Sequence, residues 1–476
     1  MKKMISLVCI AVLMMVAPVL AAPDMSVESI ALNCGYLFGN ESNEISAKIT
    51  NSGTDSNGSF EVSFVLSDGF STIESIDALA AGANTTVSIN DPTIRDSGDG
   101  VTITVTADCS GNIAENDESN NRTTLDTTVV NNGYKGKTYT GGENMTTWET
   151  YDLNGDLVYS AGDSWYLSGY YGWSSALYTT NWTASDIPVP ASAAIKEVRL
   201  YVPYCFDYQG DMSDNISLNF NGNVQTIENH YTDRKSHGSY DNPYGLLAYD
   251  VTADFDTNGN TADLTNSNPK CCAQKTASIR GMMLVVVYED ANEPRRQIFV
   301  NEDLDVLNGK SSYCTTPDEA TAWAPITGLT INPSTIASAR LVTFAPGANP
   351  AEGELIFNGH VWTDEWNDNG VHQIGISDRY VTAHLRATGN VVGFQSSADS
   401  MEASNAILIL EEGDSWADSD SDGVPDYWDD EPDTPSGYLT DSEGRGYRIG
   451  DVNRDGKLTS VDAMMILQAI VKNIEL

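Results

Sequence analysis

The sequence is poor in basic residues. Its 476 residues include only 25 Lys and Arg against 67 Asp and Glu, which gives a formal net charge of −42. A surface this negative repels phosphate backbones and excludes nucleic acid as a general partner. Charged residues make up only 19% of the chain and hydrophobic residues 41%. The chain can therefore bury substantial cores and is not a disordered acidic tail.

The common enzyme motifs are also missing. The sequence contains no GxSxG, no HExxH, no P-loop and no dinucleotide-binding fingerprint. Asp364 and Glu365 lie beside Trp362 and Trp366, as in a glycosidase cleft, but acidic pairs are so frequent here that chance explains this one better. Three histidines are too widely spaced to indicate a metal site from sequence alone: His360, His372 and His384. We predict no catalytic residues and a protein that is not an enzyme.

Long apolar runs are confined to the N-terminus. Two lysines precede an uncharged apolar run from Met4 to Leu20, and Ala21-Ala22 follows it. The run is short for a membrane span, which needs about 20 residues, and Pro18 interrupts it. This pattern predicts a cleaved secretory signal peptide over residues 1–22. The mature chain is then extracellular, at the cell surface, with no transmembrane segment.

Cysteine is scarce, and Cys9, one of the seven cysteines, lies inside the predicted signal. The other six are an even number in an oxidising compartment without CxxC spacing, which favours disulfides over zinc. Cys34 and Cys109 flank the first domain and are predicted to pair. The second group comprises Cys205, Cys271, Cys272 and Cys314. Adjacent cysteines rarely bond each other, so each of the adjacent pair is expected to bond one of the two distant cysteines, in either order.

Asn-x-Ser/Thr sequons occur only in the N-terminal half of the chain. In a secreted protein this distribution predicts a glycan-coated outer half. The predicted acceptors are Asn40, Asn57, Asn84, Asn121, Asn144, Asn181 and Asn215.

Short alternating strands fill residues 23–131, for example 44–50, 60–66 and 101–108. About seven such strands in roughly 100 residues predict an immunoglobulin-like sandwich. The order of features resembles the CARDB domains of bacterial and archaeal surface proteins. The resemblance rests on Pro23-Asp24-x-Ser-Val, Asn51-Ser-Gly53, Leu79-Ala-Ala-Gly82, Ala107-Asp108 and Ile113-x-Glu115-x-x-Glu118-x-Asn120-Asn121. It implies an adhesion or spacer module. We interpret the acidic turn at Glu115, Asp117 and Glu118 as solvated rather than cation-binding.

The central region carries an internal repeat. Four segments recur in the same order: 195–200 as 336–341, 218–222 as 355–359, 249–253 as 380–383 with one residue missing, and 284–290 as 407–412. The repeat predicts two tandem jelly-roll-like β-sandwiches over residues 132–293 and 294–413, in a chain that is mainly β. The strand order is similar to that of jelly-roll modules found in carbohydrate-binding proteins. Through Asp290-x-Asn-Glu-Pro294-Arg-Arg-x-Ile298 the block also resembles an uncharacterised surface-domain family of methanogen-type archaea, which implies location and architecture but no activity.

Two acidic twelve-residue loops near the C-terminus have calcium-loop spacing. Side-chain oxygens at positions 1, 3, 5, 9 and 12, a glycine at 6 and a backbone carbonyl at 7 suit the six to eight oxygens that calcium takes. In the linker predicted over 414–437, these ligands are Asp418, Asp420, Asp422, Val424, Asp426 and Asp429. In the loop and helix predicted over 438–476, they are Asp451, Asn453, Asp455, Lys457, Thr459 and Asp462.

The first loop resembles a thrombospondin type 3 repeat, since Pro432 and Pro435 prevent a following helix. The second resembles a dockerin repeat and precedes an apolar-faced helix. Dockerins normally carry two such repeats, which together grip a cohesin; this chain has one, so a cohesin-like partner is only implied. A third segment, Asp152–Asp163, lacks the glycine at position 6, and Asn154-Gly155 predicts a hairpin there instead.

These features predict a secreted, calcium-binding adhesion or structural protein of the cell surface. Its expected partners are other surface proteins or polysaccharide, to which Tyr170, Tyr171 and Trp173 would offer stacking faces, although core packing explains most such aromatics better. The alternative is a polysaccharide-binding or polysaccharide-degrading component mounted through the dockerin-like end. A concave cleft with two carboxylates at glycosidase spacing would favour that alternative.

Overall fold

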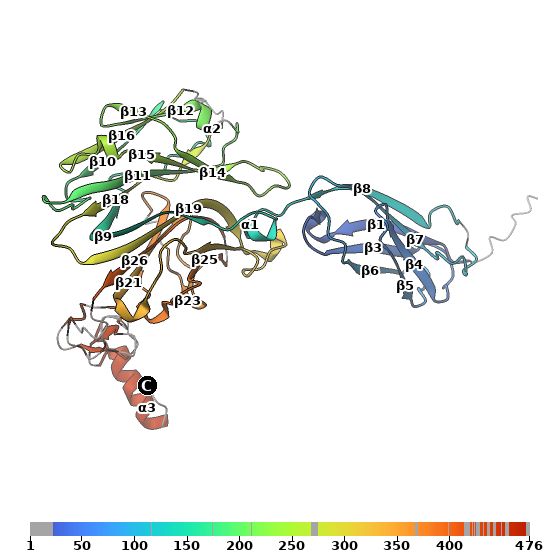
Figure 1. Ribbon diagram of the computed structural model, residues 1–476. Helices are drawn as coiled ribbons and strands as arrows, with labels where there is room; N and C mark the ends of the chain where they lie inside the picture. The colour runs from blue at the N-terminus through green and yellow to red at the C-terminus, as the bar shows by residue number, and fades with distance from the viewer. Residues whose placement is uncertain are drawn as a thin grey trace, which may run out of the picture. The chain divides into compact units, whose positions relative to one another are not determined.

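The computed structural model describes residues 22–472, except 116, 174, 211, 268–274, 367–369, 398, 414–418, 421, 423, 425–428, 432, 436–437, 441–443, 449 and 453–456. The chain forms two compact units, Met1–Val130 and Asn131–Leu476 (Figure 1). The predicted signal peptide lies outside the described residues apart from Ala22 and stays a prediction. None of the described helices has the length and apolar character needed to cross a membrane.

The first unit is a two-sheet β-sandwich (Figure 1). One sheet has the order β1 (Met25–Leu32), β3 (Asn43–Asn51) and β6 (Asn84–Asp91). The other has the order β2 (Leu37–Phe38), β8 (Arg122–Val130), β7 (Gly100–Ala107), β4 (Phe60–Leu66) and β5 (Ser71–Ile76). Alternate residues such as Ile45, Phe64 and Ile103 meet in one core between the sheets. The mainly β, sandwich-based fold class is confirmed.

The second unit is built on one long sheet. Its order is β14 (Asn229–Asp233), β15 (Tyr244–Asp250), β11 (Ala194–Cys205), β18 (Met283–Glu289), β9 (Thr146–Ser160), β19 (Arg295–Asn308), β26 (Ser400–Glu412), β21 (Ile336–Pro346) and β24 (Ile374–Tyr380), with β17 (Ser278–Ile279) beside β11. A four-stranded sheet accompanies the first half: β10 (Leu177–Thr183), β16 (Gly259–Asn266), β12 (Ile216–Phe220) and β13 (Asn223–Gln225). Another accompanies the second half: β20 (Thr321–Pro325), β25 (Val391–Ser396), β22 (Gly353–Phe357) and β23 (His360–Thr363).

Helices and small strands complete the described secondary structure. The α-helices are α1 (Gly136–Tyr139), α2 (Met212–Asn215) and α3 (Ser460–Lys472). The 3₁₀ turns are η1 (Asn33–Gly35), η2 (Thr252–Asp254), η3 (Ser311–Tyr313), η4 (Pro333–Thr335) and η5 (Thr382–His384). A separate two-stranded sheet, β27 (Leu439–Thr440) and β28 (Gly446–Tyr447), lies in the acidic C-terminal segment.

Three apolar cores hold the second unit together. One joins the first four-stranded sheet to its half of the long sheet, through residues such as Phe220 and Leu284. A second joins the other pair of layers, through Phe357 and Leu408. The third joins the opposite faces of the two halves, where Val285 and its neighbours in β11 and β18 meet β19, β21 and β26. The apolar runs of β18 and β26 are continuous because both of their faces are buried.

Strand β9 joins the two sandwiches. Its first part, from Thr146 to Asn154, pairs with β19, and its last part, from Gly155 to Ser160, pairs with β18. The predicted boundary at residue 294 falls between β18 and β19, but the sandwiches on either side of it share this strand and the third core. The predicted hairpin at Asn154-Gly155 is wrong, because this dipeptide continues the strand across both halves.

The internal repeat corresponds to equivalent strands. β11 pairs with β15 and β18, as β21 pairs with β24 and β26. Asn221-Gly222 and Asn358-Gly359 make the same left-handed turn, with φ of 50° and 91° in one and 54° and 91° in the other. Each asparagine then donates its amide to a 3₁₀-turn carbonyl, Asp254 at 2.8 Å and His384 at 2.7 Å. The two sandwiches are copies of one arrangement.

The predicted Cys34–Cys109 disulfide and the predicted disulfide at Cys205 are wrong, whereas Cys314 is disulfide-bonded as predicted. Cys109 and Cys205 carry free thiols, whereas Cys34 takes part in a disulfide and so does Cys314. The start of β1 lies beside the β7–β8 connection that contains Cys109, and Cys34 follows the far end of β1, so these two cysteines cannot meet. Cys205 is fully buried on β11, and burial raises the pKa of its thiol to about 12. Residues 271 and 272 lie outside the described residues.

Two of the predicted glycosylation sites are also corrected. Asn57 and Asn121 are buried, with 7% and 5% exposure. The Asn121 amide donates to Glu115 and Glu118, and Asn57 Oδ1 accepts the Leu79 N–H. A glycan on either side chain would break these contacts in the folded domain. Asn40, Asn84, Asn144 and Asn181 are exposed and Asn215 is half-buried, so glycosylation at these five stays a prediction.

Candidate functional site

The first calcium-type loop brings three of its predicted ligands together. Asp420, Asp422 and Asp429 place one carboxylate oxygen each within 4.8 Å of the others, and no other such group of three acidic, histidine or cysteine ligands occurs among the described residues. The Asp422 N–H donates to Asp420 at 3.2 Å and the Val424 N–H to Asp422 at 2.8 Å. The predicted ligands Asp418 and Asp426 lie outside the described residues.

Asp429 is the most enclosed of the three carboxylates, with 1% exposure. Its Oδ1 accepts the Glu431 N–H at 2.7 Å, while Gly444, at φ +79°, packs against it. A Cβ at position 444 would lie 1.8 Å from Asp429 Oδ1. Asp420 accepts the Thr434 N–H at 2.6 Å, so both aspartates bind the turn from Glu431 to Thr434 that follows the loop. The cluster is part of a folded segment rather than a free acidic string.

The second loop is closed by its last predicted ligand. Asp462 accepts the Val452 N–H at 3.0 Å through one oxygen and the Thr459 N–H at 2.8 Å through the other. Asp451 and Asp462 are 3% and 2% exposed. The helix predicted after this loop is α3, which begins at Ser460, inside the last three loop positions. Lys457 and Thr459 are described, while Asn453 and Asp455 lie outside the described residues. Leu458, Val461, Met464 and Leu467 leave an apolar surface exposed on and beside α3.

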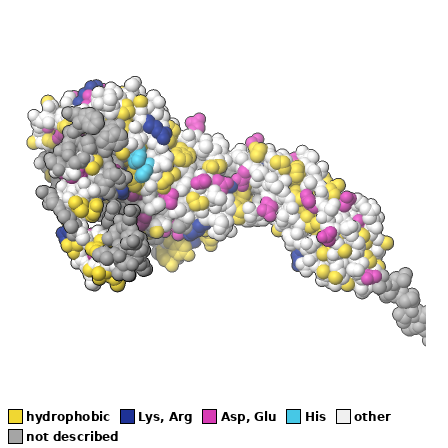
Figure 2. Space-filling model, turned by 90° about the horizontal axis from the view of Figure 1, so that it is seen from below, with side chains coloured by type: hydrophobic (Ala, Val, Ile, Leu, Met, Phe, Trp, Pro, Cys, Tyr) yellow, Lys and Arg dark blue, Asp and Glu magenta, His cyan; other side chains and the backbone are white. Residues whose placement is uncertain are grey.

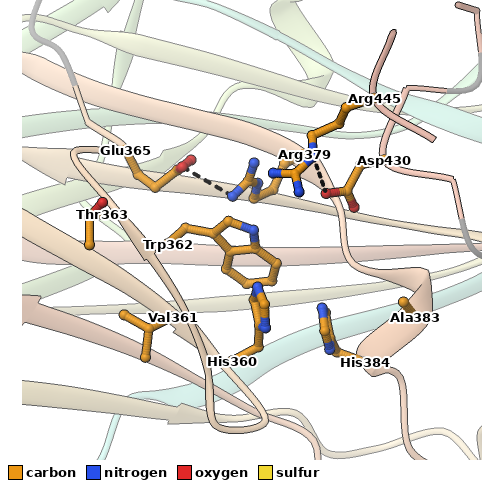
Figure 3. Close-up of a pocket in the computed structure, with 10 residues that line it drawn as sticks. All are labelled: His360, Val361, Trp362, Thr363, Glu365, Arg379, Ala383, His384, Asp430 and Arg445. Atoms are coloured by element: carbon orange, nitrogen blue, oxygen red, sulfur yellow. Dashed lines mark hydrogen bonds and ion pairs between the residues drawn. The ribbon is translucent and has the colours of Figure 1, made fainter. Parts of the chain in front are cut away.

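A cavity of about 650 Å³ lies beside the first loop (Figure 3). Three parts of the chain line it: β23, the β24–η5 region and the acidic segment. The lining side chains used below are His360, Trp362, Glu365, Arg379, His384 and Arg445, together with Asp430. This site was not predicted from the sequence, because His360 and His384 are too widely spaced there to indicate a site and the acidic pair beside Trp362 is explained by chance.

The arginines lie on one side of the cavity and the aromatic rings of Trp362, His360 and His384 on the other (Figure 3). His360 and His384 stack with their ring centroids 3.9 Å apart, and His360 also contacts Trp362 edge-on at 4.3 Å. The Arg379 guanidinium lies 4.4 Å from the Trp362 ring centroid and donates to Glu365 at 3.0 Å. Burial lowers the pKa of Arg379. Arg445 lies 4.0 Å from Asp430. Such a mixture suits a polar ligand with an apolar face.

The tyrosines singled out in the sequence form an exposed cluster elsewhere. Tyr170 and Tyr171 are 46% and 70% exposed, and Lys275 Nζ lies 4.3 Å from the Tyr170 ring and 4.8 Å from the Tyr208 ring. Trp173 is not exposed: it is 1% accessible and donates to the Ala277 carbonyl at 2.9 Å. Its role as a sugar-stacking face is therefore excluded. Figure 2 shows acidic side chains spread along the face it draws, while histidine surface is confined to one spot.

The acidic turn of the first unit is partly enclosed. Glu115 accepts hydrogen bonds from the Met25 N–H and, at 3.1 Å, from Asn121. Burial raises the pKa of Glu115, with smaller contributions from Glu118 and Asp108. The Asp117 carboxylate caps Ser119 at 2.9 Å. These contacts hold the turn in place.

Family comparison places most of the chain in one group. The model of DUF3344, described as a protein of unknown function, matches residues 138–411. The chain belongs to the DUF3344 family. The CARDB model matches residues 22–125, which confirms the resemblance of the first unit. No curated protein matches this DUF3344 chain.

Several solved structures are similar to parts of this DUF3344 protein. The CARDB domain of a Pyrococcus furiosus protein, crystallised in complex with di-metal ions, is 21% identical with a TM-score of 0.21, over 23% of this chain and 90% of that chain. A domain of a candidate cell surface protein from Methanosarcina acetivorans is 27% identical with a TM-score of 0.21, over 23% and 92%. A β-porphyranase of the gut bacterium Bacteroides plebeius is 11% identical with a TM-score of 0.19, over 52% and 35%.

Proposed function

We propose that this DUF3344 chain is a non-catalytic, calcium-binding protein of the cell surface with an adhesive or structural role. The observation that carries the proposal is the convergence of Asp420, Asp422 and Asp429 within 4.8 Å, at loop positions predicted from spacing alone. The CARDB module at residues 22–125 and the apolar N-terminal run support a place outside the cell. The likeness to a domain of a cell surface protein accords with this.

Calcium suits the cluster better than other metals. All three groups are carboxylates, which are hard oxygen ligands, and calcium accepts the irregular, high-coordination geometry that such loops provide. Three carboxylates this close repel each other, and a divalent cation removes that repulsion. Gly444 and the Thr434 N–H hold Asp429 and Asp420 in place from outside the cluster.

The second loop is a second calcium candidate. Its first and last predicted ligands, Asp451 and Asp462, are almost fully buried. Asp462 accepts a hydrogen bond from Val452, the residue next to Asp451, so the two ends of the loop meet. The apolar residues of α3 offer a surface for another protein, and the resemblance to a dockerin repeat makes a cohesin-like domain one proposed partner. Other surface proteins and polysaccharide are the remaining proposed partners.

The polysaccharide-degrading alternative receives less support. The cavity beside the first loop does contain two carboxylates, Glu365 and Asp430. Each faces an arginine, at 3.0 Å and 4.0 Å, instead of standing as a proton donor in an apolar setting. A glycosidase needs one carboxylic acid kept protonated near neutral pH, which burial away from cations provides. We therefore favour binding over hydrolysis.

Calorimetric titration of calcium into the chelator-stripped mature protein tests the proposal. Two sites are expected, one lost in Asp420→Ala and the other in Asp451→Ala. Gly444→Ala should weaken the first site while leaving every ligand in place, because its Cβ would displace Asp429. Asp318→Ala, at an exposed acidic position away from both loops, is the matched control. No binding heat, or equal heat in all variants, would overturn the proposal.

A further inference from the structure

The cavity in Figure 3 lies where the two copies of the internal repeat differ. The strand after the shared Asn-Gly turn is β13 in the first copy and β23 in the second. In the first copy, Phe220 pairs with Asn223 and Leu218 with Gln225. In the second copy, Phe357 pairs with His360 and Leu355 with Trp362. Position by position, His360 therefore replaces Asn223 and Trp362 replaces Gln225. In the 3₁₀ turn, His384 replaces Asp254.

The first copy satisfies these positions internally. Asn223 donates to Asp254 at 2.7 Å and Gln225 donates to the other oxygen of the same carboxylate at 2.6 Å. In the second copy the same three positions hold two stacked imidazoles and an indole in edge contact with them. Because the turn, the strand pairing and the core are shared, the scaffold does not explain the change.

A fourth position changes in the same place. Leu200 pairs with Tyr249 on β15, and Leu341 pairs with Arg379 on β24. Tyr249 is a core residue with 1% exposure, whereas its counterpart Arg379 brings a guanidinium over Trp362 beside the cavity. The Nε of Arg379 is buried and has no hydrogen-bond acceptor among the described residues. A buried donor of this kind usually serves a ligand or an ordered water.

We propose that this cavity binds an acidic sugar, a pyranose that carries a carboxylate, and that Asp430 and Arg445, the chain neighbours of Asp429 and Gly444, form one of its walls. The inference rests on the proposed calcium binding for its metal dependence. The cavity, at about 650 Å³, has room for one or two sugar rings. The histidine and tryptophan rings supply flat apolar faces, while Glu365 and Asp430 supply acceptors for hydroxyl groups.

Charge selects the acidic sugar over a neutral one. In a chain of net charge −42, an anion reaches the surface only where cations gather. Arg379 and Arg445 both line this cavity. Each already faces one carboxylate, Glu365 or Asp430, but a guanidinium has five donors, and those left over, such as the Arg379 Nε, can bind a ligand carboxylate. A calcium ion on the adjoining loop would add positive charge on the same side.

The metal loop and the cavity share two short pieces of backbone. Asp430, which lines the cavity, directly follows the cluster ligand Asp429. Arg445, which also lines it, directly follows Gly444, the residue packed against Asp429. Loss of the metal would release Asp429 and shift both neighbours. Sugar binding should therefore depend on calcium although no sugar contact to the metal is required.

Isothermal titration of digalacturonic acid into the full mature chain, with calcium in excess, tests the inference. Neutral galactobiose is the ligand control. The double variant His360→Asn with His384→Asp installs the first copy's own hydrogen-bonded pair, so it should fold and lose at least tenfold in affinity. Arg445→Ala should lose about tenfold, the effect of removing one carboxylate partner. Asn223→His, the reciprocal change in the first copy, should leave affinity unchanged.

The outcomes separate this inference from the proposed function. Binding of digalacturonic acid that falls in both cavity variants and on chelation supports it. Equal binding of the two disaccharides, no binding of either, or binding unchanged in the cavity variants overturns it, even if the calcium titration gives two sites. Digalacturonic acid binding that persists with chelator overturns the proposed calcium dependence of sugar binding. The calcium titration then shows independently whether the loops bind metal.

Discussion

At the scale of single residues, the second unit contains a buried carboxyl pair that no sequence pattern indicated. Asp233 ends β14 and Asp305 lies in β19. The Val306 N–H donates to Asp233 at 2.8 Å and the Lys137 N–H donates to Asp305 at 3.0 Å. Burial raises the pKa of Asp233 to about 6, and burial with the nearby Asp233 charge raises the pKa of Asp305 well above its usual range. Lys137 acts in the opposite direction but does not compensate.

This pair should make the second unit less stable as pH rises. A carboxyl whose folded pKa is raised contributes stability that is full below its unfolded pKa, about 4, and that is lost as pH rises through the folded pKa. Asp305→Asn keeps an acceptor for Lys137 and removes the charge, so it should be more stable than wild type at pH 8 by about 1–3 kcal/mol and differ little at pH 4.5. All nine tryptophans follow residue 130, so tryptophan fluorescence in urea reports this unit alone. An equal effect of the substitution at both pH values would contradict the assignment.

At the scale of elements, β9 shows why a local turn pattern failed. Asn154-Gly155 is a strong hairpin signal because glycine adopts positive φ easily. Here glycine serves a different need: Gly155 lies opposite Glu289, and a Cβ would come within 2.0 Å of the Tyr288 carbonyl oxygen. The dipeptide marks the point where β9 changes partners from β19 to β18. Long-range pairing overrode the local preference.

Gly155→Ala should therefore destabilise the second unit strongly. The added methyl group would collide with the backbone carbonyl of Tyr288, and no side-chain shift can relieve that collision. The free energy of unfolding should therefore fall by more than about 2 kcal/mol. Glu149→Ala, at an exposed position of the same strand, should change it by less than about 0.5 kcal/mol. Urea denaturation followed by tryptophan fluorescence measures both. Similar midpoints for the two variants would show that β9 tolerates the methyl group.

At the scale of the whole molecule, the sandwiches and the acidic C-terminal segment rely on different forces. The three cores of the second unit are apolar and contain no proposed metal ligand. The acidic segment places Asp420, Asp422 and Asp429 together, and their repulsion opposes folding unless a cation is bound. Metal removal should therefore act locally.

Chelation should loosen residues 414–476 and leave the sandwiches folded. Hydrogen exchange with and without chelator should show faster exchange at the Glu431, Thr434 and Thr459 amides, which donate to loop aspartates. The amides of β18 and β26, at the centre of the long sheet, should exchange at unchanged rates. Global unfolding on chelation would contradict this separation.

Local and periodic features were readable from the sequence alone. Period-two alternation predicted the sandwiches, a repeated series of segments predicted the two copies, and oxygen spacing predicted that Asp420, Asp422 and Asp429 would converge. These succeed because alternation and ligand spacing are set within a few residues of chain. The repeat register also contained the signal for the His360–His384 contact, since their counterparts Asn223 and Asp254 meet in the same way.

Only the tertiary structure decided which distant surfaces meet. It joined two sandwiches through β9 and a shared core, left Cys109 and Cys205 as free thiols, buried Asn57 and Asn121, and placed Arg379 over Trp362. The physical reason is that such pairings depend on the summed burial of the apolar cores of each unit rather than on any local preference. Sequence determined the strands, the two copies and the acidic loops. Long-range packing determined the cavity that the second sandwich forms with the acidic segment.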